Sequence, residues 1–209
     1  MKMENGQNSS GSFTPLQEAV EILKKGGIVA AATETFFGLL ADIYREDTIE
    51  RLKKIKKLQP NDPLIIIAPS FDEVMKMCEI ISPHALKLIE RYWPGPLTLI
   101  LKARISLPSY ITGPFSTIAV RVPGGCDAGE IVKKFMGPLT ATSCNVHRQP
   151  PVTSSREALE KFGKEIDFIV PGWSPGGLPS TIVDVTVTPP VIRRRGIVNV
   201  EGKYLRQKL

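Results

Sequence analysis

Short, wholly apolar segments constrain the fold of this chain more than any other feature of its sequence. Residues 28–32 (IVAAA) and 63–68 (PLIIIA) lack the polar alternation of a half-solvated strand, so each predicts a strand that is buried on both faces. Segments with the signature of helix starts lie between these strands and after them. Because buried strands that alternate with helices usually pair in parallel beneath those helices, the pattern predicts an α/β fold.

Polar residues mark the predicted helix starts. Thr14, followed by Pro15 and Gln17, combines an N-cap, a proline in the first turn and a capping-box partner. The same reasoning places further caps at Asp47, Ser70, Ser82, Asp127 and Ser154. These caps divide the first three quarters of the chain into helices separated by short strands.

The later part of the chain is dominated by strands. Besides the two buried segments, strands are predicted at 96–103, 117–122, 138–143, 167–170, 181–187, 190–194 and 197–200. Helices between the early strands indicate parallel pairs, and the closing run of strands indicates antiparallel hairpins. We therefore predict one α/β domain over residues 13–209 around a large mixed sheet. Residues 1–12 are predicted to be a disordered polar tail, and they lack the apolar core of a secretion signal.

Composition narrows the chemistry that is available. Only His84 and His147 are present, which excludes a histidine-rich zinc site and an HExxH motif. The net charge of +6 favours anionic partners such as nucleotides, phosphates or RNA. The three cysteines have no CxxC spacing, as is typical of unpaired thiols in a reducing compartment. No apolar run reaches the roughly 18 residues needed to span a bilayer, so we expect a cytoplasmic protein with no membrane partner.

Two polar segments follow predicted strands, where α/β sheets usually place ligands. The first, residues 33–39 (TETFFGL), either binds a ligand through its hydroxyls and carboxylate or is a turn closed by threonine side chains. In the second, residues 141–147, an extended chain places Ser143 and Asn145 on one side, where they could hold a phosphate or a ribose. Cys144 then points the other way and is expected to be buried, and His147 is expected in an exposed loop.

Basic residues gather in two other places. The predicted helix 47–58 carries Arg51, Lys53, Lys54, Lys56 and Lys57. Lys53, Lys56 and Lys57 share one side of this helix, so they either face a polyphosphate or form a solvated face. Arg193, Arg194 and Arg195 follow the hydroxyl-bearing segment 178–184, and the two segments could converge on an anion. The four segments together indicate a site for ATP and a small polar co-substrate.

These four segments, in this order, resemble the YrdC family of threonylcarbamoyl-AMP synthases over residues 14 to about 200. The similar motifs are TETFFGLLAD, YWPGPLTLIL, TIAVRVPGG, PLTATSCN and GGLPSTIVD. The resemblance implies an open twisted sheet flanked by helices around a wide basic cavity, in a single-domain form of the family. It also implies a nucleotidyltransferase that joins L-threonine, bicarbonate and ATP into threonylcarbamoyl-adenylate and releases pyrophosphate.

The same resemblance implies partners and site residues. The product would serve adenosine-37 modification (t6A) of tRNA, with ATP and Mg²⁺ required and other tRNA-threonylcarbamoylation proteins as partners. The residues implied at the nucleotide are Lys56, Thr117, Ser143, Asn145 and Arg194. Those implied around threonine and its carbamate are Thr33, Thr35, Arg121, Ser180 and Thr181. No side chain is implied as an acid or base, and no metal site made of protein side chains alone.

The sequence departs from the family pattern at the nucleotide end. The lysine-x-arginine motif is Lys56-Lys57-Leu58 here, and Asp62 stands where a basic residue is expected before Pro63. Loss of a guanidinium at a triphosphate would cost roughly 1.5 to 3 kcal/mol of charged hydrogen bonding. Two alternatives therefore remain open: a divergent member that binds tRNA or double-stranded RNA without catalysis, and a nucleotidyltransferase with a different co-substrate.

Overall fold

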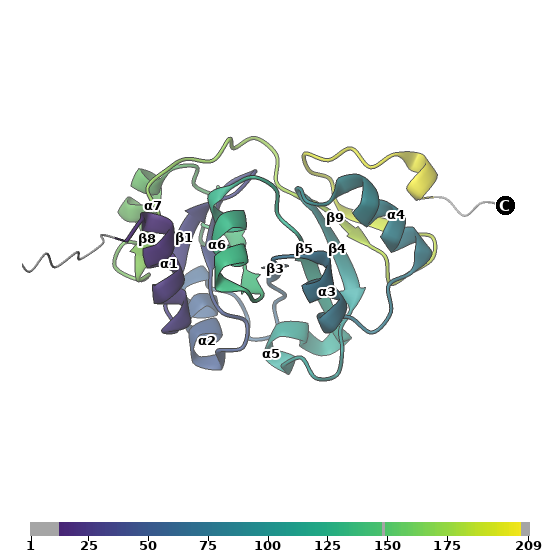
Figure 1. The fold of residues 1–209 in the computed structure, drawn as a ribbon, viewed down its shortest axis with the longest axis horizontal. Coiled ribbons are helices and arrows are strands. Elements are labelled where there is room, and N and C mark those ends of the chain that lie inside the picture. The colour runs from purple at the N-terminus through teal and green to yellow at the C-terminus, as the bar shows by residue number, and fades with distance from the viewer. Residues whose placement is uncertain (1–12, 148, 206–209) are drawn as a thin grey trace, which may run out of the picture.

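A computed structural model of the chain describes residues 13–147 and 149–205. The predicted polar tail, residues 1–12, and the basic Arg148 lie outside the described residues. The strands form two sheets that are flanked by helices (Figure 1), as expected for an α/β fold. In the described part of the chain, no helix combines the length and the apolar character needed to cross a membrane.

The first sheet has the strand order β7-β2-β1-β8. Its strands are β1 (Val29–Ala32), β2 (Phe37–Leu40), β7 (Thr142–Ser143) and β8 (Phe168–Ile169). Both faces of β1 are buried, as its apolar sequence predicts: Val29 and Ala31 join one apolar cluster, and Ala30 joins another. Strand β1 pairs antiparallel with β2 and parallel with β8.

The second sheet has the order β10-β9-β4-β5-β3-β6. Its strands are β3 (Ile65–Ile67), β4 (Leu97–Lys102), β5 (Thr117–Arg121), β6 (Leu139–Thr140), β9 (Thr181–Asp184) and β10 (Val191–Arg194). Parallel pairs (β3 with β5, β4 with β9) and antiparallel pairs (β4 with β5, β9 with β10) occur together, which confirms the predicted mixed pairing.

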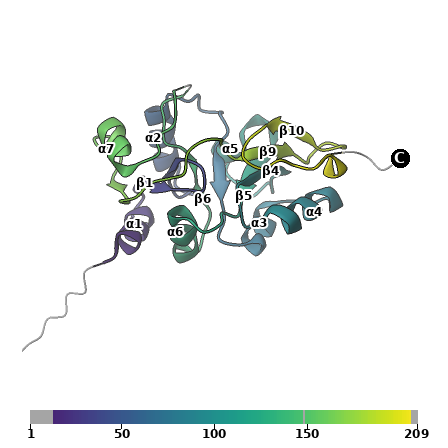
Figure 2. The ribbon, with the colours of Figure 1, turned by 90° about the horizontal axis from the view of Figure 1, so that it is seen from above.

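Helices and 3-10 turns flank the sheets. They are α1 (Pro15–Lys24), α2 (Glu46–Lys56), α3 (Phe71–Met77), α4 (Pro83–Tyr92), α5 (Ser109–Thr112), α6 (Asp127–Phe135) and α7 (Ser155–Phe162), with 3-10 turns η1 (Gly113–Phe115) and η2 (Gly202–Tyr204). Helices α1, α6, α3 and α4 form a row on one side of the molecule (Figure 2). Helices α1 and α6 pack together against β1.

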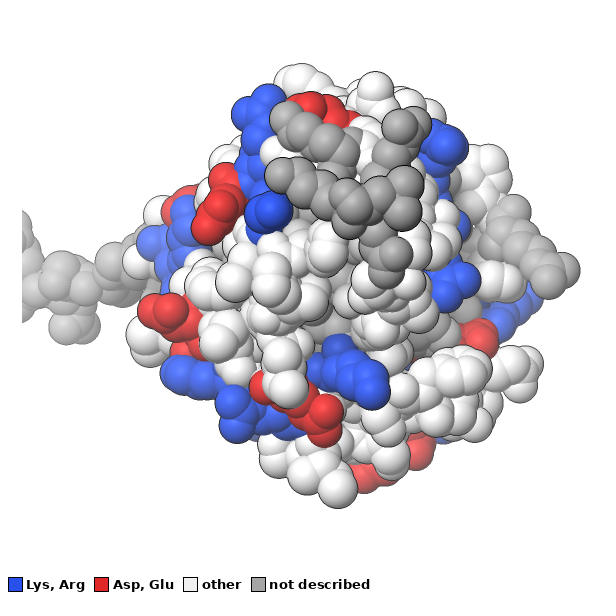
Figure 3. Space-filling model, turned by 90° about the vertical axis from the view of Figure 1, so that its right-hand side faces the viewer, with Lys and Arg blue, Asp and Glu red and all other residues white. Residues whose placement is uncertain are grey.

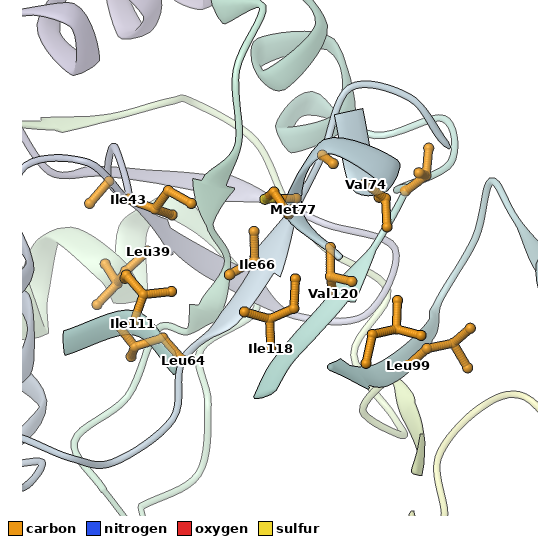
Figure 4. Close-up of a cluster of buried hydrophobic side chains, with 14 of the residues drawn as sticks. Leu39, Ile43, Leu64, Ile66, Val74, Met77, Leu99, Ile111, Ile118 and Val120 are labelled. Carbon is orange, nitrogen blue, oxygen red and sulfur yellow. The ribbon is translucent and has the colours of Figure 1, made fainter. Parts of the chain in front are cut away.

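Alternation along the central strands separates a packed face from a polar one. Ile118 and Val120 of β5 belong to the main apolar cluster, together with Val74 and Met77 of α3 (Figure 4). Thr117 and Arg121 of the same strand point to the opposite face, where they line a cavity. The period of two in a strand thus gives this sheet one face for the core and one face for a site.

Some details of the predicted elements are wrong, beginning with two helix caps. The N-cap residues of α2 and α6 are Arg45 and Cys126, neither with a capping side-chain hydrogen bond, so Asp47 and Asp127 lie within the first turn. An acidic residue is favoured there too, because it faces the positive end of the helix dipole. The serine and threonine caps at Thr14, Ser70, Ser82 and Ser154 are confirmed.

Two predicted strands and the predicted single sheet are also wrong. The predicted strand 138–143 is divided at Ala141 into β6 and β7, which belong to different sheets. This segment therefore passes from the second sheet to the first, and the strands form two sheets instead of one large sheet. Residues 197–200 form no strand; Val198 instead accepts a hydrogen bond from the Thr181 hydroxyl through its carbonyl oxygen.

Candidate functional site

A cavity of about 1300 Å³ lies on the polar face of the second sheet and reaches the β1–β2 turn. Nine of the ten predicted site residues line it: Thr33, Thr35, Lys56, Thr117, Arg121, Ser143, Asn145, Ser180 and Arg194. They come from segments that are far apart in the sequence, so the fold gathers the predicted residues around one space. A cavity of this size can hold a nucleotide and a small co-substrate.

The segment between β1 and β2 is a turn closed by threonine side chains, which is one of the two alternatives that the sequence left open. The Thr33 hydroxyl donates to the Phe36 carbonyl at 2.7 Å and accepts from the Thr35 amide at 3.1 Å, so it closes the turn. The two threonine hydroxyls lie 3.2 Å apart. Both residues also line the cavity. The hydrogen bonds that shape the turn therefore hold two hydroxyl groups at the cavity wall.

A buried ion pair lies beside this turn. Arg121 Nη1 is 3.1 Å from Glu34 Oε2, and the two side chains are only 3% and 14% exposed. Glu34 Oε1 accepts a hydrogen bond from the Gly124 amide at 2.6 Å, which fixes the carboxylate. Among the described residues, Arg121 Nε and Nη1 and Glu34 Oε2 are buried and make no hydrogen bond, so charge attraction holds the pair together. Arg121 also lines the cavity, where its positive charge favours an anionic ligand.

Lys56 is buried against the Ser143–Asn145 segment. Its Nζ donates to the carbonyl oxygens of Ser143 and Asn145, the latter at 2.8 Å, and to Asn145 Oδ1 at 3.0 Å. The Ser143 hydroxyl donates to the same Oδ1 at 2.6 Å. Burial lowers the pKa of Lys56 to about 8, with Cys144 partly opposing this shift. The Lys56 ammonium group therefore fixes the conformation of the segment that carries the Ser143 hydroxyl and the Asn145 amide, both predicted to bind the nucleotide.

Neither interpretation of the basic helix face is correct as stated. Lys53 and Lys56 are buried rather than solvated, and Lys53 donates to the carbonyl oxygens of Pro60 and Tyr110. Lys57 is exposed at the left-handed residue that ends α2. Of these three lysines, only Lys56 lines the cavity.

Residues Cys144 and His147 lie where the sequence predicted. Cys144 is fully buried, and burial raises the pKa of its thiol to about 12. It is therefore a packed thiol rather than a nucleophile. His147 is exposed and belongs to the cavity lining.

Arg194 supplies a second guanidinium group to the cavity. Its Nε donates to the Ser180 carbonyl at 3.0 Å and its Nη2 to the Ser180 hydroxyl at 2.8 Å. Burial lowers the pKa of Arg194, and the positive charge of Arg121 lowers it further. Two cationic groups that repel each other within one cavity favour the binding of an anion between or beside them.

Thr181 is the one predicted site residue that does not line the cavity. Its hydroxyl donates to the Val198 carbonyl at 2.7 Å and accepts from the amides of Gly196 and Val198, both at 3.1 Å. Thr181 follows Ser180 in an extended chain, so the two side chains point to opposite sides. The resemblance that implied both residues could not separate these two roles.

Glu34, Asp184 and Arg193 belong to segments that the sequence singled out, but the ion pairs that they form were not predicted. Glu34 lies between two predicted threonines, but nothing in the sequence shows that its partner is Arg121. Asp184 and Arg193 line the cavity and form an ion pair of 2.6 Å. The two residues are separated by nine positions and lie on the two strands of a predicted hairpin, so the sequence could have predicted that they pair.

The family model described as Telomere recombination, which covers Sua5, YciO and YrdC proteins, matches residues 21–196. The chain belongs to the Sua5/YciO/YrdC family. A protein of Coxiella burnetii named Threonylcarbamoyl-AMP synthase is 35% identical over 179 residues, which is 85% of this chain and 96% of that protein. A protein of Pyrococcus abyssi with the same name is 35% identical over 88% of this chain and 54% of its own length. The chain thus spans about half of the Pyrococcus protein.

Solved structures of other members of this family have a similar fold. P. abyssi Sua5 complexed with L-threonine has a TM-score of 0.82 and 35% identity, over 87% of this chain and 54% of that one. E. coli YciO has a TM-score of 0.81 and 25% identity, over 91% of this chain and 92% of that one. The predicted YrdC-like α/β fold is confirmed. Leu58 and Asp62, the two departures from the family pattern, both line the cavity.

Proposed function

We propose that this protein is a threonylcarbamoyl-AMP synthase, an ATP-using nucleotidyltransferase that acts in the cytoplasm. Its product would serve t6A modification of tRNA together with other threonylcarbamoylation proteins. The observation that carries the proposal is the enclosure of Arg121, Arg194 and Lys56 in one cavity with neutral hydroxyl and amide groups. Relatives named Threonylcarbamoyl-AMP synthase, 32–35% identical over most of the chain, support the same substrates.

The cavity residues divide between two ligands in this proposal. Lys56, Thr117, Ser143, Asn145 and Arg194 would surround the nucleotide. Thr33, Thr35, Arg121 and Ser180 would surround threonine and its carbamate. Arg121 suits the carboxylate of threonine, because it lines the cavity and a guanidinium presents two parallel donors to a carboxylate. Thr181 would support this wall from behind through its bonds to residues 196–198.

The reaction requires little acid or base chemistry from the protein. The amine of threonine and bicarbonate form a carbamate with loss of water. A carbamate oxygen then attacks the α-phosphorus of ATP, and the bond to pyrophosphate breaks. Such an in-line displacement depends on positioning and on neutralisation of phosphate charge. Arg194 and Lys56 would supply that charge from positions fixed by the fold.

Mg²⁺ would enter with the phosphates of ATP, whose charge it neutralises. Among the described residues, no group of three or more His, Cys, Asp or Glu side chains is placed to hold a metal ion. Asp184 lines the cavity, but its two oxygens accept hydrogen bonds from Thr186 and Arg193. Asp184 is therefore already engaged by protein donors, and the cation would be held mainly by substrate phosphates.

The test is pyrophosphate release from ATP in the presence of bicarbonate, with and without L-threonine. The proposal predicts release that requires threonine and that falls strongly in Arg194→Ala. Serine, glycine and valine in place of threonine distinguish a different co-substrate. Absence of amino-acid-dependent release under conditions in which the C. burnetii relative is active would refute the proposal.

Binding of tRNA or double-stranded RNA without catalysis is a separate candidate, favoured by Leu58 and Asp62 in the cavity lining. On the face shown in Figure 3, Lys and Arg side chains are dispersed among neutral and acidic ones. A dispersed arrangement offers weaker attraction to a phosphate backbone than a continuous basic stripe. RNA affinity that falls steeply with salt, together with undetectable ATP binding, would favour this candidate over the synthase.

A further inference from the structure

Strand β10 contains an irregularity next to the cavity. It pairs with β9 alone, at the edge of the second sheet. Val191 pairs with Asp184 and Arg194 pairs with Ile182, but the register shifts between Ile192 and Arg194. Arg193 is therefore the extra residue of a β-bulge.

The bulge changes which side chains reach the cavity. In a regular strand, neighbouring residues point to opposite faces. Here Arg193 and Arg194 are neighbours, and both line the cavity. Pairing without the extra residue would place Arg193 opposite Ile182 and turn Arg194 to the other face of the sheet. The position of Arg194 thus depends on the bulge.

Arg193 is attached to a fixed, buried carboxylate. Its Nε and Nη2 donate to Asp184 Oδ2 at 3.0 and 2.6 Å. The other oxygen of Asp184 accepts from the Thr186 amide at 3.0 Å and from its hydroxyl at 2.6 Å. Burial by itself would raise the pKa of Asp184, but the hydrogen bonds from Thr186 and Arg193 outweigh it and hold the pKa below its ordinary value. The carboxylate is therefore a charged anchor for the extra residue of the bulge.

The Arg194 guanidinium must be held in the cavity against repulsion from a neighbouring positive charge. It lies close enough to Arg121 for the two positive charges to repel, and its own hydrogen bonds go to Ser180. An edge strand with a bulge can shift its register at low cost, because only one neighbouring strand opposes the shift. The ion pair between Arg193 and Asp184 joins the extra residue of the bulge to β9.

We propose that Arg193 is a positioning residue, whose ion pair with Asp184 holds the bulge of β10 and thereby keeps the Arg194 guanidinium in the cavity. The inference rests on the proposed function for the identity of the anion, ATP, that Arg194 would bind. Arg193 would act through Arg194 and not touch that anion itself. A direct contact of Arg193 with the anion is the competing explanation.

A double-mutant cycle distinguishes the two explanations. Calorimetric affinity for ATP and the KM for ATP in pyrophosphate release are measured for wild type, Arg193→Ala, Arg194→Ala and the double variant. We expect Arg193→Ala to weaken ATP binding about tenfold through KM, with the double variant no weaker than Arg194→Ala. Arg193→Lys should recover part of the loss. Losses that add in the double variant, or an unchanged affinity in Arg193→Ala, would overturn the proposal.

The matched control is Arg195→Ala. Arg195 is exposed, follows the same strand and carries the same charge, but it does not line the cavity. Its removal should leave ATP affinity unchanged. A loss equal to that of Arg193→Ala would show a general effect of net charge and would contradict a specific role for the ion pair.

A second readout needs no nucleotide and remains valid if the synthase proposal fails. The Arg194 Nε–H donates to the Ser180 carbonyl, so its NMR signal should exchange slowly with solvent in wild type and in Arg195→Ala. It should exchange rapidly in Arg193→Ala, while the amides of β4 and β5 stay protected. If Arg193→Ala does not fold, Arg193→Met is measured in its place, because methionine keeps an unbranched stem but has no N–H donor for Asp184. Slow exchange of the Arg194 signal in the folded variant refutes the positioning role whatever the protein catalyses.

Discussion

Replacement of Glu34 by Gln is expected to destabilise the protein strongly, although it changes almost no volume. The glutamine can keep its carbonyl oxygen on the Gly124 amide, which now donates to Oε1 at 2.6 Å. It removes the negative charge that lies 3.1 Å from Arg121 Nη1. Arg121 would then be a buried cation with no anionic partner, beside the positive charge of Arg194.

The magnitude follows from the burial of the pair. Both partners are largely shielded from water, with exposed fractions of 3% and 14%. Removal of one partner from such a pair costs about 3 to 5 kcal/mol, because the other charge stays buried. For a chain of this size each kcal/mol lowers the melting temperature by about 2 to 4 °C, so Glu34→Gln should melt roughly 6 to 20 °C below wild type.

Thermal unfolding followed by circular dichroism at neutral pH measures this difference. Glu50→Gln is the matched control, because Glu50 pairs with Lys54 at 3.8 Å where the side chains are 61% and 80% exposed. An exposed pair on one helix contributes less than about 1 kcal/mol. Equal melting temperatures for Glu34→Gln and Glu50→Gln would show that the Arg121 charge does not depend on Glu34.

Three further predictions concern groups that the structure buries. The pKa of Lys56 falls from 10.5 to about 8 on folding, so the unfolded chain binds more protons between these values. Stability should therefore rise with pH across this window by about 3 kcal/mol, and urea titrations should show that the rise is missing in Lys56→Met. Thr181→Val should lower the free energy of unfolding by about 1 to 3 kcal/mol through its bonds to Gly196 and Val198, yet leave threonine affinity unchanged in calorimetry. Because burial raises the pKa of Cys144 to about 12, mass spectrometry should find its thiol unmodified by iodoacetamide in native protein at pH near 8 and alkylated after unfolding.

Local signals in the sequence were sufficient for most elements of the fold. The apolar segments 28–32 and 63–68 became β1 and β3, and four hydroxyl-bearing caps start helices as predicted. The helix starts were predicted wrongly where two different physical effects favour the same residue type in the sequence. An aspartate near a helix start serves equally as a cap or as a charge in the first turn, so Asp47 and Asp127 were placed one position or more from the true cap.

Long-range contacts explain what the sequence could not show in the site. The division of segment 138–143 at Ala141 depends on its pairing with β3 and β2, which the local residues do not encode. The burial of Lys53 and Lys56 depends on carbonyl oxygens brought from distant segments, such as those of Tyr110 and Asn145. Charge periodicity indicates a helix face but not what covers it.

The family resemblance supplied the residues of the cavity, and the structure supplied their geometry. Nine of the ten implied residues line one space, which no single motif would have established. Thr181 differs because the alternation of an extended chain turns it away from Ser180. The ion pair that restrains Arg194 was not anticipated, because a bulge shifts register by one residue and leaves no clear mark in the sequence.

The most direct measurement is mass spectrometry of the nucleotide product after incubation of the protein with ATP, Mg²⁺, L-threonine and carbon-labelled bicarbonate. If the cavity joins these substrates as proposed, threonylcarbamoyl-adenylate appears with the label from bicarbonate, and it disappears when threonine is omitted. The C. burnetii relative, assayed in parallel, serves as the positive control. Formation of labelled product by the relative and none by this protein would contradict the proposed function.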